Sequence, residues 1–267
     1  MAEPADMGVR RFGRVNWLGL GTLATREIRR FMTVWTQTLA APLVTAALFI
    51  AVFSLAIGPG RGDVMGVPYV QFLAPGILTM TVIQNAFANT SSSIMSAKVQ
   101  GNIVDTLMPP LSPAELLAGY MAGAIARGTF VAAAIVVFLL IVVGGGVAYP
   151  GWVAVFAVLG AAMMGGLGIV AAIYATKFDQ QAAITNFIIT PLSFLSGTFY
   201  SIERLPPAMQ TLLHVNPMFY LIDGVRYGMI GQSDSSPWLG LAVVTAAVAA
   251  VLGLCWHWLR TGYRLKA

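Results

Sequence analysis

Charged side chains are scarce in this chain: of its 267 residues, 9% are Asp, Glu, Lys or Arg and 58% are hydrophobic. Because soluble domains carry roughly 25% charged residues, this composition excludes an ordinary soluble fold. The charges also leave long intervals empty, among them Phe31 to Gly60, Val64 to Ala97 and Gly128 to Thr176. One membrane crossing needs about 20 apolar residues, so the sequence predicts a polytopic membrane protein.

Cysteine and histidine are nearly absent, with one cysteine, Cys255, and two histidines, His214 and His257. A single cysteine excludes an internal disulfide framework and any site built from paired cysteine ligands, so we expect no metal in this chain. An intramembrane serine protease is disfavoured because neither histidine has a path to a serine within a span. The sequence also has no Gly-x-x-x-x-Gly-Lys-Ser/Thr, the loop that cradles nucleotide phosphates. We therefore expect no catalytic residue and no cofactor in the chain itself.

Carboxylates are missing from the interior of the apolar stretches. Five acidic residues lie in connections or near the ends of these stretches: Asp105, Glu115, Asp179, Glu203 and Asp223. Ion-coupled secondary carriers usually need carboxylates within the membrane, and the internal repeat of many such carriers is not evident here. A secondary carrier is therefore a distant alternative.

The apolar stretches predict an all-α protein with six transmembrane helices. We place the spans at Trp35–Gly58, Pro68–Ile94, Leu116–Val143, Trp152–Tyr174, Ala182–Tyr200 and Trp238–Leu259. On this basis residues 1–34 form a cytoplasmic tail with an interfacial helix, residues 35–259 the transmembrane domain, and residues 260–267 a second cytoplasmic tail.

Lysine and arginine gather on one side of the predicted membrane. An even number of spans places both termini on the same side, together with Lys98 and Lys177, whereas the opposite side has only Arg61, Arg204 and Arg226. By the positive-inside rule, both termini are cytoplasmic. The net charge of +5 then reflects topology and contact with anionic membrane lipids, and no nucleic acid is expected as a partner.

Residues 16–33 have the periodicity of an amphipathic helix. Five apolar residues recur at helical spacing: Trp17, Leu20, Ala24, Ile28 and Phe31. Three arginines lie opposite them: Arg26, Arg29 and Arg30. The pattern predicts an interfacial helix along the cytoplasmic leaflet; the alternative is a cytoplasmic extension of the first span. No apolar stretch before Arg30 has the length of a signal peptide, so we expect the first span to direct insertion.

The main cytoplasmic connection, residues 96–115, has the pattern of a short helix followed by the start of a long one. Asn102 is placed to cap the short helix, and Pro109-Pro110 ends it. Its apolar face would comprise Ile103, Val104 and Leu107. Ser112-Pro113-Ala114-Glu115 is a capping box that begins the third span. A short helix held between two spans is a lever for a cytoplasmic partner; a plain turn is the alternative.

Three polar residues within predicted spans are candidates for a substrate pathway: Arg127, Asn85 and Asn89. If the third helix begins at Pro113, Arg127 lies about 20 Å along it, where an isolated charge is costly and usually functional. If the crossing instead runs from Gly128 to Ala148, Arg127 snorkels to the cytoplasmic interface. The two asparagines need protein or water around them, so they line a pathway or form hydrogen bonds between helices.

Prolines interrupt residues 201–230, the stretch before the last span. Pro206-Pro207 and Pro217 remove backbone donors, so this stretch is not one continuous spanning helix. Because proline suits the first helical turn, we predict two short helices here, Pro207–Val215 and Pro217–Ile230. We interpret them as a re-entrant helical hairpin at the outer face.

Three stretches resemble the type-2 permease subunits of bacterial ATP-binding-cassette exporters. They are SAKVQGNIVDTLMPPLSPAELLAGYMAGAIARG, KFDQQAAI and TPLSFLSGTFYSIERLPPAMQTLLHVNPMFYLIDGVRYG. The resemblance covers essentially the whole chain. It is greatest to small inner-membrane permeases of Proteobacteria that are related to polysaccharide and nodulation-factor exporters.

The resemblance implies a homodimer of six-span subunits in the bacterial inner membrane, each docked to a separate cytoplasmic ATPase that binds ATP and Mg. The positions that match the family's ATPase-coupling helix are Gln100, Gly101, Asn102, Ile103, Val104, Asp105, Leu107 and Met108. A tight turn supplies the second candidate contact with the ATPase: Lys177, Phe178 and Asp179. The family's re-entrant helices match Leu205 to Ile230. The implied function is export of an amphipathic, lipid-linked or polysaccharide-type substrate; efflux of a hydrophobic drug is the alternative.

Overall fold

The computed structural model describes residues 14–56, 58–202 and 205–265. Over these residues it is almost entirely helical, which confirms the predicted all-α class. The helices are α1 (Trp17–Met32), α2 (Trp35–Ala56), α3 (Gly58–Arg61), α4 (Tyr69–Val99), α5 (Ile103–Leu107), α6 (Pro113–Val142), α7 (Pro150–Tyr174), α8 (Phe178–Ile184), the π-helix η1 (Thr185–Ile189), α9 (Thr190–Leu195), α10 (Pro207–Val215), α11 (Pro217–Ile230) and α12 (Pro237–Thr261). Two short strands, β1 (Asp63–Val64) and β2 (Val67–Pro68), pair antiparallel before α4.

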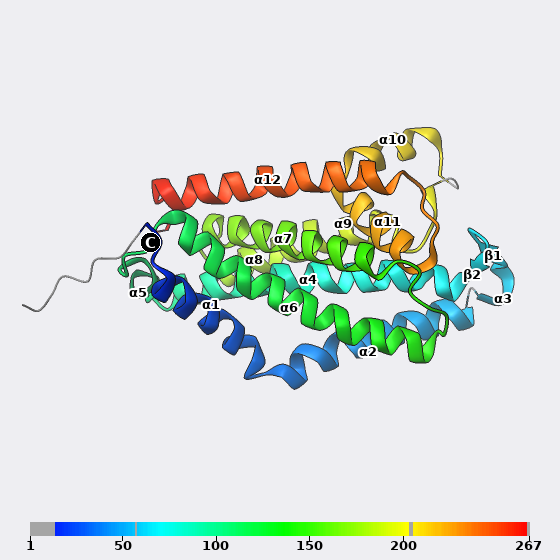
Figure 1. Cartoon of the computed structure of the whole chain (residues 1–267), viewed down its shortest axis with the longest axis horizontal. Coiled ribbons are helices and arrows are strands. Elements are labelled where there is room, and N and C mark those ends of the chain that lie inside the picture. Colours follow the sequence, from blue (N-terminus) through cyan, green and yellow to red (C-terminus); the bar gives the residue numbers. More distant parts are fainter. Residues whose placement is uncertain (1–13, 57, 203–204, 266–267) are drawn as a thin grey trace, which may run out of the picture.

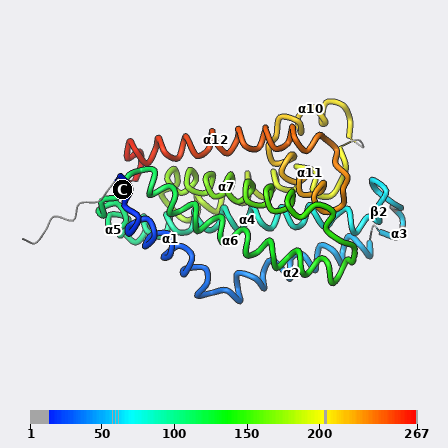
Figure 2. Tube along the Cα trace, in the orientation of Figure 1, coloured from blue at the N-terminus to red at the C-terminus, as the bar shows by residue number. Residues whose placement is uncertain are grey.

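The long helices α4, α6, α7 and α12 lie roughly side by side along the long axis of the molecule (Figure 1). At one end of this bundle lies α5, at the same end as the last turn of α12, and toward the other lie α10 and the two strands (Figure 1). We call these the α5 end and the α10 end. The backbone trace shows that α1 and α2 meet at an angle on one side of the bundle (Figure 2).

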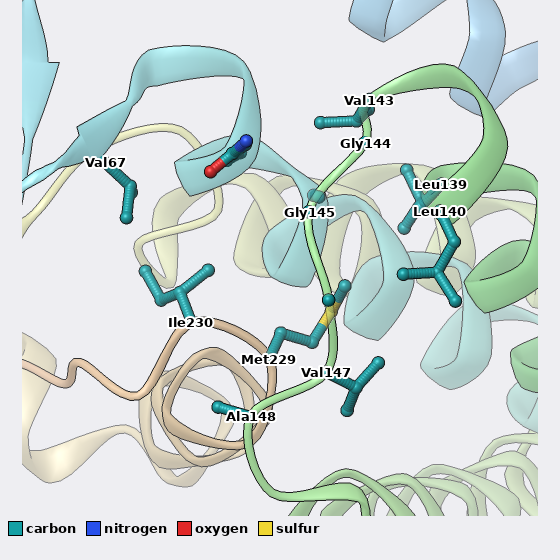
Figure 3. A pocket seen from close by; sticks show the side chains of 13 residues that line it. Val67, Leu139, Leu140, Val143, Gly144, Gly145, Val147, Ala148, Met229 and Ile230 are labelled. Atoms are coloured by element: carbon teal, nitrogen blue, oxygen red, sulfur yellow. The ribbon is translucent and has the colours of Figure 1, made fainter.

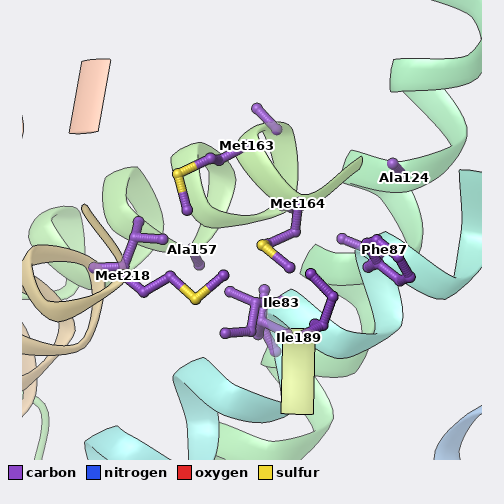
Figure 4. Packing of buried hydrophobic residues seen from close by; sticks show 14 of the residues in the cluster. Ile83, Phe87, Ala124, Ala157, Met163, Met164, Ile189 and Met218 are labelled. Atoms are coloured by element: carbon purple, nitrogen blue, oxygen red, sulfur yellow. The ribbon is translucent and has the colours of Figure 1, made fainter. Parts of the chain in front are cut away.

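The centre of the bundle is the contact between α4 and α7, the two most buried of the long apolar helices. Met164 of α7 packs beside Ile83 of α4, and Met218 of α11 and Ile189 of η1 complete this part of the core (Figure 4). Methionine fills such irregular gaps well because its side chain is unbranched and flexible.

Small residues let α4 and α7 approach closely. A Cβ added at Gly168 of α7 would overlap the Phe87 carbonyl oxygen and the Thr90 hydroxyl of α4. The same Thr90 hydroxyl donates a hydrogen bond to the Gly165 carbonyl oxygen at 2.7 Å. The two backbones therefore touch here with no room for a larger residue.

We expect Gly168→Ala to lower the free energy of unfolding by about 1–3 kcal/mol, because overpacking forces a tightly packed core apart. Thermal denaturation of the purified protein in detergent measures the change. Gly253→Ala on α12 is the matched control, since an added Cβ meets nothing within 4 Å there. Equal melting temperatures for the two variants would contradict the prediction.

Five helices among the described residues are long and apolar enough to cross a membrane: α2, α4, α6, α7 and α12. The remaining predicted span, Ala182–Tyr200, corresponds to α8, η1 and α9. These three follow one another without a break, because Thr185 and Thr190 at the junctions keep right-handed helical backbone angles. The widened turn of η1 divides an apolar segment that the sequence presents as uniform, and the number of six spans stays a prediction.

The two short helices before the last span have the predicted bounds, Pro207–Val215 and Pro217–Ile230. Each has a proline at its start, where the missing N–H has no partner to lose. Asn216 caps the start of α11, and its side-chain oxygen accepts a hydrogen bond from the Met218 N–H at 3.0 Å. α11 is buried in the bundle against α7, α12 and α4, whereas Leu213 is the one buried residue of α10.

Candidate coupling face and polar cavity

The segment that carries α5 is anchored at both ends. On the α4 side, the Lys98 ammonium donates hydrogen bonds to the carbonyl oxygens of Ala172, Ile173 and Ala175 at 3.0, 2.8 and 2.6 Å. These carbonyls belong to the end of α7, where a helix leaves acceptors unpaired and favours a positive charge. Lys98 therefore fixes the end of α4 on the end of α7.

On the other side, the predicted capping box at Ser112 is confirmed. The Glu115 N–H donates to the Ser112 hydroxyl at 3.3 Å, and the Ser112 N–H donates to the Glu115 carboxylate at 2.6 Å. The second carboxylate oxygen of Glu115 accepts from the Asn16 N–H at 2.6 Å. One side chain thus joins the starts of α6 and α1.

The exposed face of α5 differs from the predicted one. Ile103 and Thr106 are both only 6% exposed, whereas Val104 and Met108 are 48% and 75% exposed. The prediction that Ile103 faces a partner is wrong, because residues three apart lie on the same side of a helix and this side rests on the chain's own bundle. Asn102 takes the predicted cap position, but its side chain donates to Gln100 and caps nothing. Four other candidates on this segment are exposed, namely Gln100, Gly101, Asn102 and Asp105, and Leu107 is half-buried.

The turn at Lys177 lies at the same end of the bundle as α5. Lys177, Phe178 and Asp179 are all exposed, and they follow directly after the Ala175 carbonyl that Lys98 binds. The structure therefore brings both predicted cytoplasmic contacts to one end of the molecule.

α1 is joined to α4 and α5 by a buried carboxylate that the sequence analysis did not identify. Glu27 has no exposed surface, and its carboxylate accepts a hydrogen bond from the Ser93 hydroxyl at 2.9 Å. Arg26 and Arg30 approach the same carboxylate at 2.9 and 3.5 Å. Arg26 also donates to the Thr106 hydroxyl of α5 at 3.0 Å. Glu27 and its partners thus form a latch between α1 and the rest of the bundle.

The contacts of Arg26 change the pKa of its guanidinium. Burial lowers the pKa of its guanidinium, but the hydrogen bond and charge of Glu27, together with Tyr120, outweigh burial. The pKa of Arg26 therefore lies above its ordinary value, and the side chain stays charged at any physiological pH.

α1 docks in a notch on α6 made by Gly119 and Gly123. A Cβ at Gly119 would come within 2.5 Å of the Leu23 side chain, and one at Gly123 within 2.5 Å of the Glu27 side chain. The buried face of α1 consists of Leu23, Glu27 and Phe31. Of the predicted apolar face, only Phe31 is buried, whereas Trp17 is 73% exposed. The reason is that the shape of the α6 notch decides which face of α1 is buried. Two glycines four residues apart are the sequence signal for such a notch.

Arg127 and Asn85, two of the candidate pathway residues, lie together. The Arg127 guanidinium donates to the Asn85 side-chain oxygen at 3.1 Å, and the Asn85 amide donates to the Thr81 carbonyl oxygen at 3.0 Å. Both line a cavity of about 430 Å³ between α2, α4 and α6. α6 begins at Pro113, so Arg127 is about 20 Å along the helix.

Asn89 does not line this cavity. It is fully buried, and its side-chain oxygen accepts a hydrogen bond from Arg30 at 3.1 Å. Arg30 also donates to the Asn89 carbonyl oxygen and to the Ser92 hydroxyl. For Asn89 the structure therefore favours the second of the two alternatives, hydrogen bonding between helices.

A second buried charge cluster lies toward the α10 end, around Arg226. The Arg226 guanidinium contacts Asp234 at 2.9 Å and Asp223 at 3.6 Å, donates to the Gly197 carbonyl oxygen at 2.6 Å, and lies over the Phe72 ring at 4.3 Å. None of the three charged side chains is more than 2% exposed. Arg226 is among the predicted outer charges, but its burial was not predicted, because the pairing with Asp234 depends on a turn of the chain after α11.

Another cavity, of about 310 Å³, lies at this end beside the glycine loop that links α6 to α7. Met229 and Ile230 of α11 face the backbone of Gly144 and Gly145 across it (Figure 3). Gly145 has a φ of 87°, a left-handed conformation that glycine adopts at little cost. No lining residue of this cavity is charged, so the Arg127 cavity is the stronger candidate for binding a polar ligand.

Comparison with known proteins identifies the family of this chain. Residues 19–230 match the family described as ABC-2 type transporter. The inner membrane transport permease YadH of Escherichia coli K12 is 37% identical over 251 residues, which cover 94% of this chain and 98% of YadH. Nodulation protein J of Rhizobium leguminosarum bv. viciae is 28% identical over 244 residues, 87% of this chain and 89% of that protein. This multi-pass membrane chain therefore belongs to the ABC-2 type transporter family and is the permease of an ABC transporter.

Proposed function

We propose that this chain is the permease of an exporter in the bacterial inner membrane and moves an amphipathic, lipid-linked or polysaccharide-type substrate outward. ATP hydrolysis, with its Mg, would take place in a separate cytoplasmic ATPase. The similarity to an inner membrane transport permease and to a nodulation protein supports this function. The observation that carries it is α5, an ordered helix that presents Val104 and Met108 to the surroundings at one end of the bundle.

The charge distribution supports a cytoplasmic position for the α5 end and both termini. Exposed or partly exposed cations gather there: Arg26, Arg29, Lys98, Lys177, Arg260 and Arg264. Positive charge on the cytoplasmic side is the general rule for membrane proteins. In this orientation α5 and the Lys177 turn both face the ATPase.

A homodimer of permeases with two ATPases is the assembly we propose. α2 has exposed apolar side chains along its length: Val44, Leu48, Val52 and Leu55. The α8–η1–α9 segment has others: Phe178, Phe187, Ile188 and Leu195. These faces suit either lipid or a second copy, and a pathway between two copies would place the polar cavity within reach of the substrate.

Hydrogen bonds and ion pairs connect α5 with α4, one of the helices that form that cavity, and support a route for force. Thr106 of α5 is bonded to Arg26, and Arg26 and Arg30 share Glu27. Arg30 in turn binds Asn89, which lies one helical turn from Asn85 on α4. A movement of α5 would therefore act on α1 and α4 together.

Efflux of a hydrophobic drug, the alternative function, would require a different kind of binding cavity. A hydrophobic drug needs an apolar site, and an apolar cavity of about 340 Å³ does lie between α9 and α10. The cavity at Arg127 instead favours a molecule with an anionic group. Measuring which compounds stimulate ATP hydrolysis by the assembled transporter separates the two.

If α5 docks on the ATPase, the double variant Val104→Ala with Met108→Ala should lose the ATPase during purification. Truncating two apolar side chains removes about 2–4 kcal/mol of burial, which weakens docking by about one to three powers of ten. The measurement is the yield of ATP-binding subunit that co-purifies with the affinity-tagged permease from host membranes.

Leu212→Ala with Val215→Ala is the matched control, because these side chains of α10 are 71% and 77% exposed at the opposite end. This variant should retain the ATPase. A wild-type yield of ATPase with the α5 variant would exclude α5 as the docking helix, and the turn at Lys177 would become the better candidate.

A further inference from the structure

The cavity between α2, α4 and α6 has more polar groups in its wall than its membrane setting requires. Besides Arg127 and Asn85, the side chains of Gln37, Thr38, Thr45 and Gln84 line it. Long apolar helices place polar groups where they have partners, because an unpaired polar group in hydrocarbon is costly. The Thr38 and Thr45 hydroxyls already donate to the Phe31 and Ala41 carbonyl oxygens, but the concentration of amides and one guanidinium at a single cavity calls for a ligand or a partner.

Arg127 lacks a counter-charge among the described residues. The ion pairs there involve Arg26, Arg30 and Arg226, and Arg127 makes none. Its side-chain hydrogen bond goes to a neutral amide, and its Nε atom is buried with no hydrogen-bond partner in the described part of the chain. A charge that acts on it, that of Arg30, is also positive. The cavity is therefore electropositive.

The neutral residues around Arg127 suit an anion as well. The amides of Gln84 and Gln37 can each donate hydrogen bonds, and guanidinium binds phosphate oxygens in a bidentate, charge-assisted manner. A volume of about 430 Å³ has the size of a site for a small molecule or a head group. Met80 and Pro42 supply apolar wall, and α2 is the least buried of the spanning helices, so an acyl or prenyl chain can lie along it.

We propose that this cavity binds the phosphate-type head group of an amphipathic molecule. Arg127 supplies the charge, and Asn85, Gln84 and Gln37 supply neutral contacts. A transported lipid phosphate and an anionic phospholipid of the membrane have the same head-group chemistry. The step from a bound head group to a transported one depends on the proposed export function, whereas binding itself does not.

Protection of a cysteine in the cavity wall tests the proposal. The full-length permease would carry Cys255→Ser and Thr45→Cys, in nanodiscs of phosphatidylcholine, and the rate of labelling by a small maleimide would be measured. Dihexanoylphosphatidylglycerol and geranyl diphosphate are the anionic probes, and dihexanoylphosphatidylcholine is the zwitterionic one. We expect anionic probes to slow labelling, and Arg127→Gln to raise the half-protecting concentration about tenfold to hundredfold. Arg127→Lys keeps the charge and should have a smaller effect.

Two controls separate binding from a change of fold. Leu48 lies on the same helix, is 60% exposed and does not line the cavity. The probes should therefore leave the labelling of Leu48→Cys unchanged. Arg260→Gln removes a guanidinium near the end of α12. In this variant the anionic probes should slow labelling at position 45 as much as they do with Arg260 in place. Because a nearby guanidinium makes a thiol more reactive, protection is expressed for each variant as the ratio of its labelling rates with and without probe.

The outcomes are distinct. Protection by geranyl diphosphate alone supports the site and indicates that its ligand is a substrate-like prenyl phosphate. Protection by dihexanoylphosphatidylglycerol alone also supports the site and indicates that its ligand is a membrane phospholipid. No protection by either anionic probe, equal protection by dihexanoylphosphatidylcholine, or unchanged protection in Arg127→Gln would overturn the proposal. Because the permease is tested without its ATPase, such a result leaves the docking of α5 untouched, and failure of docking leaves this site untouched.

Discussion

Replacing Arg226 by methionine should lower the free energy of unfolding by about 3–5 kcal/mol, the cost of removing one partner from a buried ion pair. The variant would leave Asp223 and Asp234 buried without their cation, since neither carboxylate is more than 2% exposed. Thermal denaturation in detergent would show a large drop in melting temperature, and less protein would reach the membrane.

Two further variants isolate the cause. Arg260→Met removes an exposed guanidinium that lies 5.1 Å from the Trp256 ring, and we expect little change. Combining Arg226→Met with Asp223→Asn and Asp234→Asn removes the uncompensated charge and should recover part of the loss. A melting temperature equal to that of the wild type for Arg226→Met would show that these carboxylates have another source of compensation.

The loss of stability is expected because Arg226 connects three segments of the chain. Its guanidinium links α11 to Asp234 in the connection before α12 and to Gly197 after α9. Asp223 in turn accepts hydrogen bonds from the backbone N–H groups of Asp234 and Ser235 at 2.7 and 2.9 Å. The cluster thus fixes α11 to the segment after α9 and to the connection before α12.

Replacing Glu27 by alanine should release α1 from the bundle and lower stability by about 2–4 kcal/mol, through the loss of charge-assisted hydrogen bonds. The effect is smaller than at Arg226 because the side chains left behind, Arg26 and Arg30, are 47% and 36% exposed and can turn to water. Trypsin cleaves after arginine, so release of α1 should appear as faster cleavage after Arg26 and Arg30. The same variant should weaken the coupling of ATP hydrolysis to transport, since α1 joins α5 to α4.

Glu27→Gln serves as the intermediate variant, because it keeps an acceptor for the Ser93 hydroxyl but loses the charge. Arg29→Gln is the control, since Arg29 is exposed and lies outside the Glu27 latch; its removal should not speed cleavage at Arg30. Cleavage of Glu27→Ala at the wild-type rate would mean that Leu23, Phe31 and the glycine notch alone hold α1.

Local signals in the sequence predicted local structure well. The two helices that begin at Pro207 and Pro217 have the predicted bounds, and the capping box at Ser112 forms as its spacing indicates. In each case the backbone chemistry of a few adjacent residues decides the outcome, so no knowledge of distant parts of the chain is needed.

Local sequence patterns mislead where a distant part of the chain decides the environment of a side chain. Glu27 lies among arginines and has the pattern of a solvated residue, yet a glycine notch on α6 encloses it. Ile103 has an apolar partner in its own bundle, which the pattern of a short helix cannot reveal. Glu27 does lie four residues from both Leu23 and Phe31, and that spacing is the signal that identifies the buried face.

The anchoring of α5 has a consequence for how a partner would recognise it. Lys98 and the Ser112 capping box hold the two ends of this segment within the single chain. Ordering a flexible residue costs roughly 1–2 kcal/mol of conformational entropy, and a segment that is already ordered avoids that cost when it binds. α5 is thus preorganised: we expect its affinity for a partner to depend on surface complementarity, with no folding step to slow association.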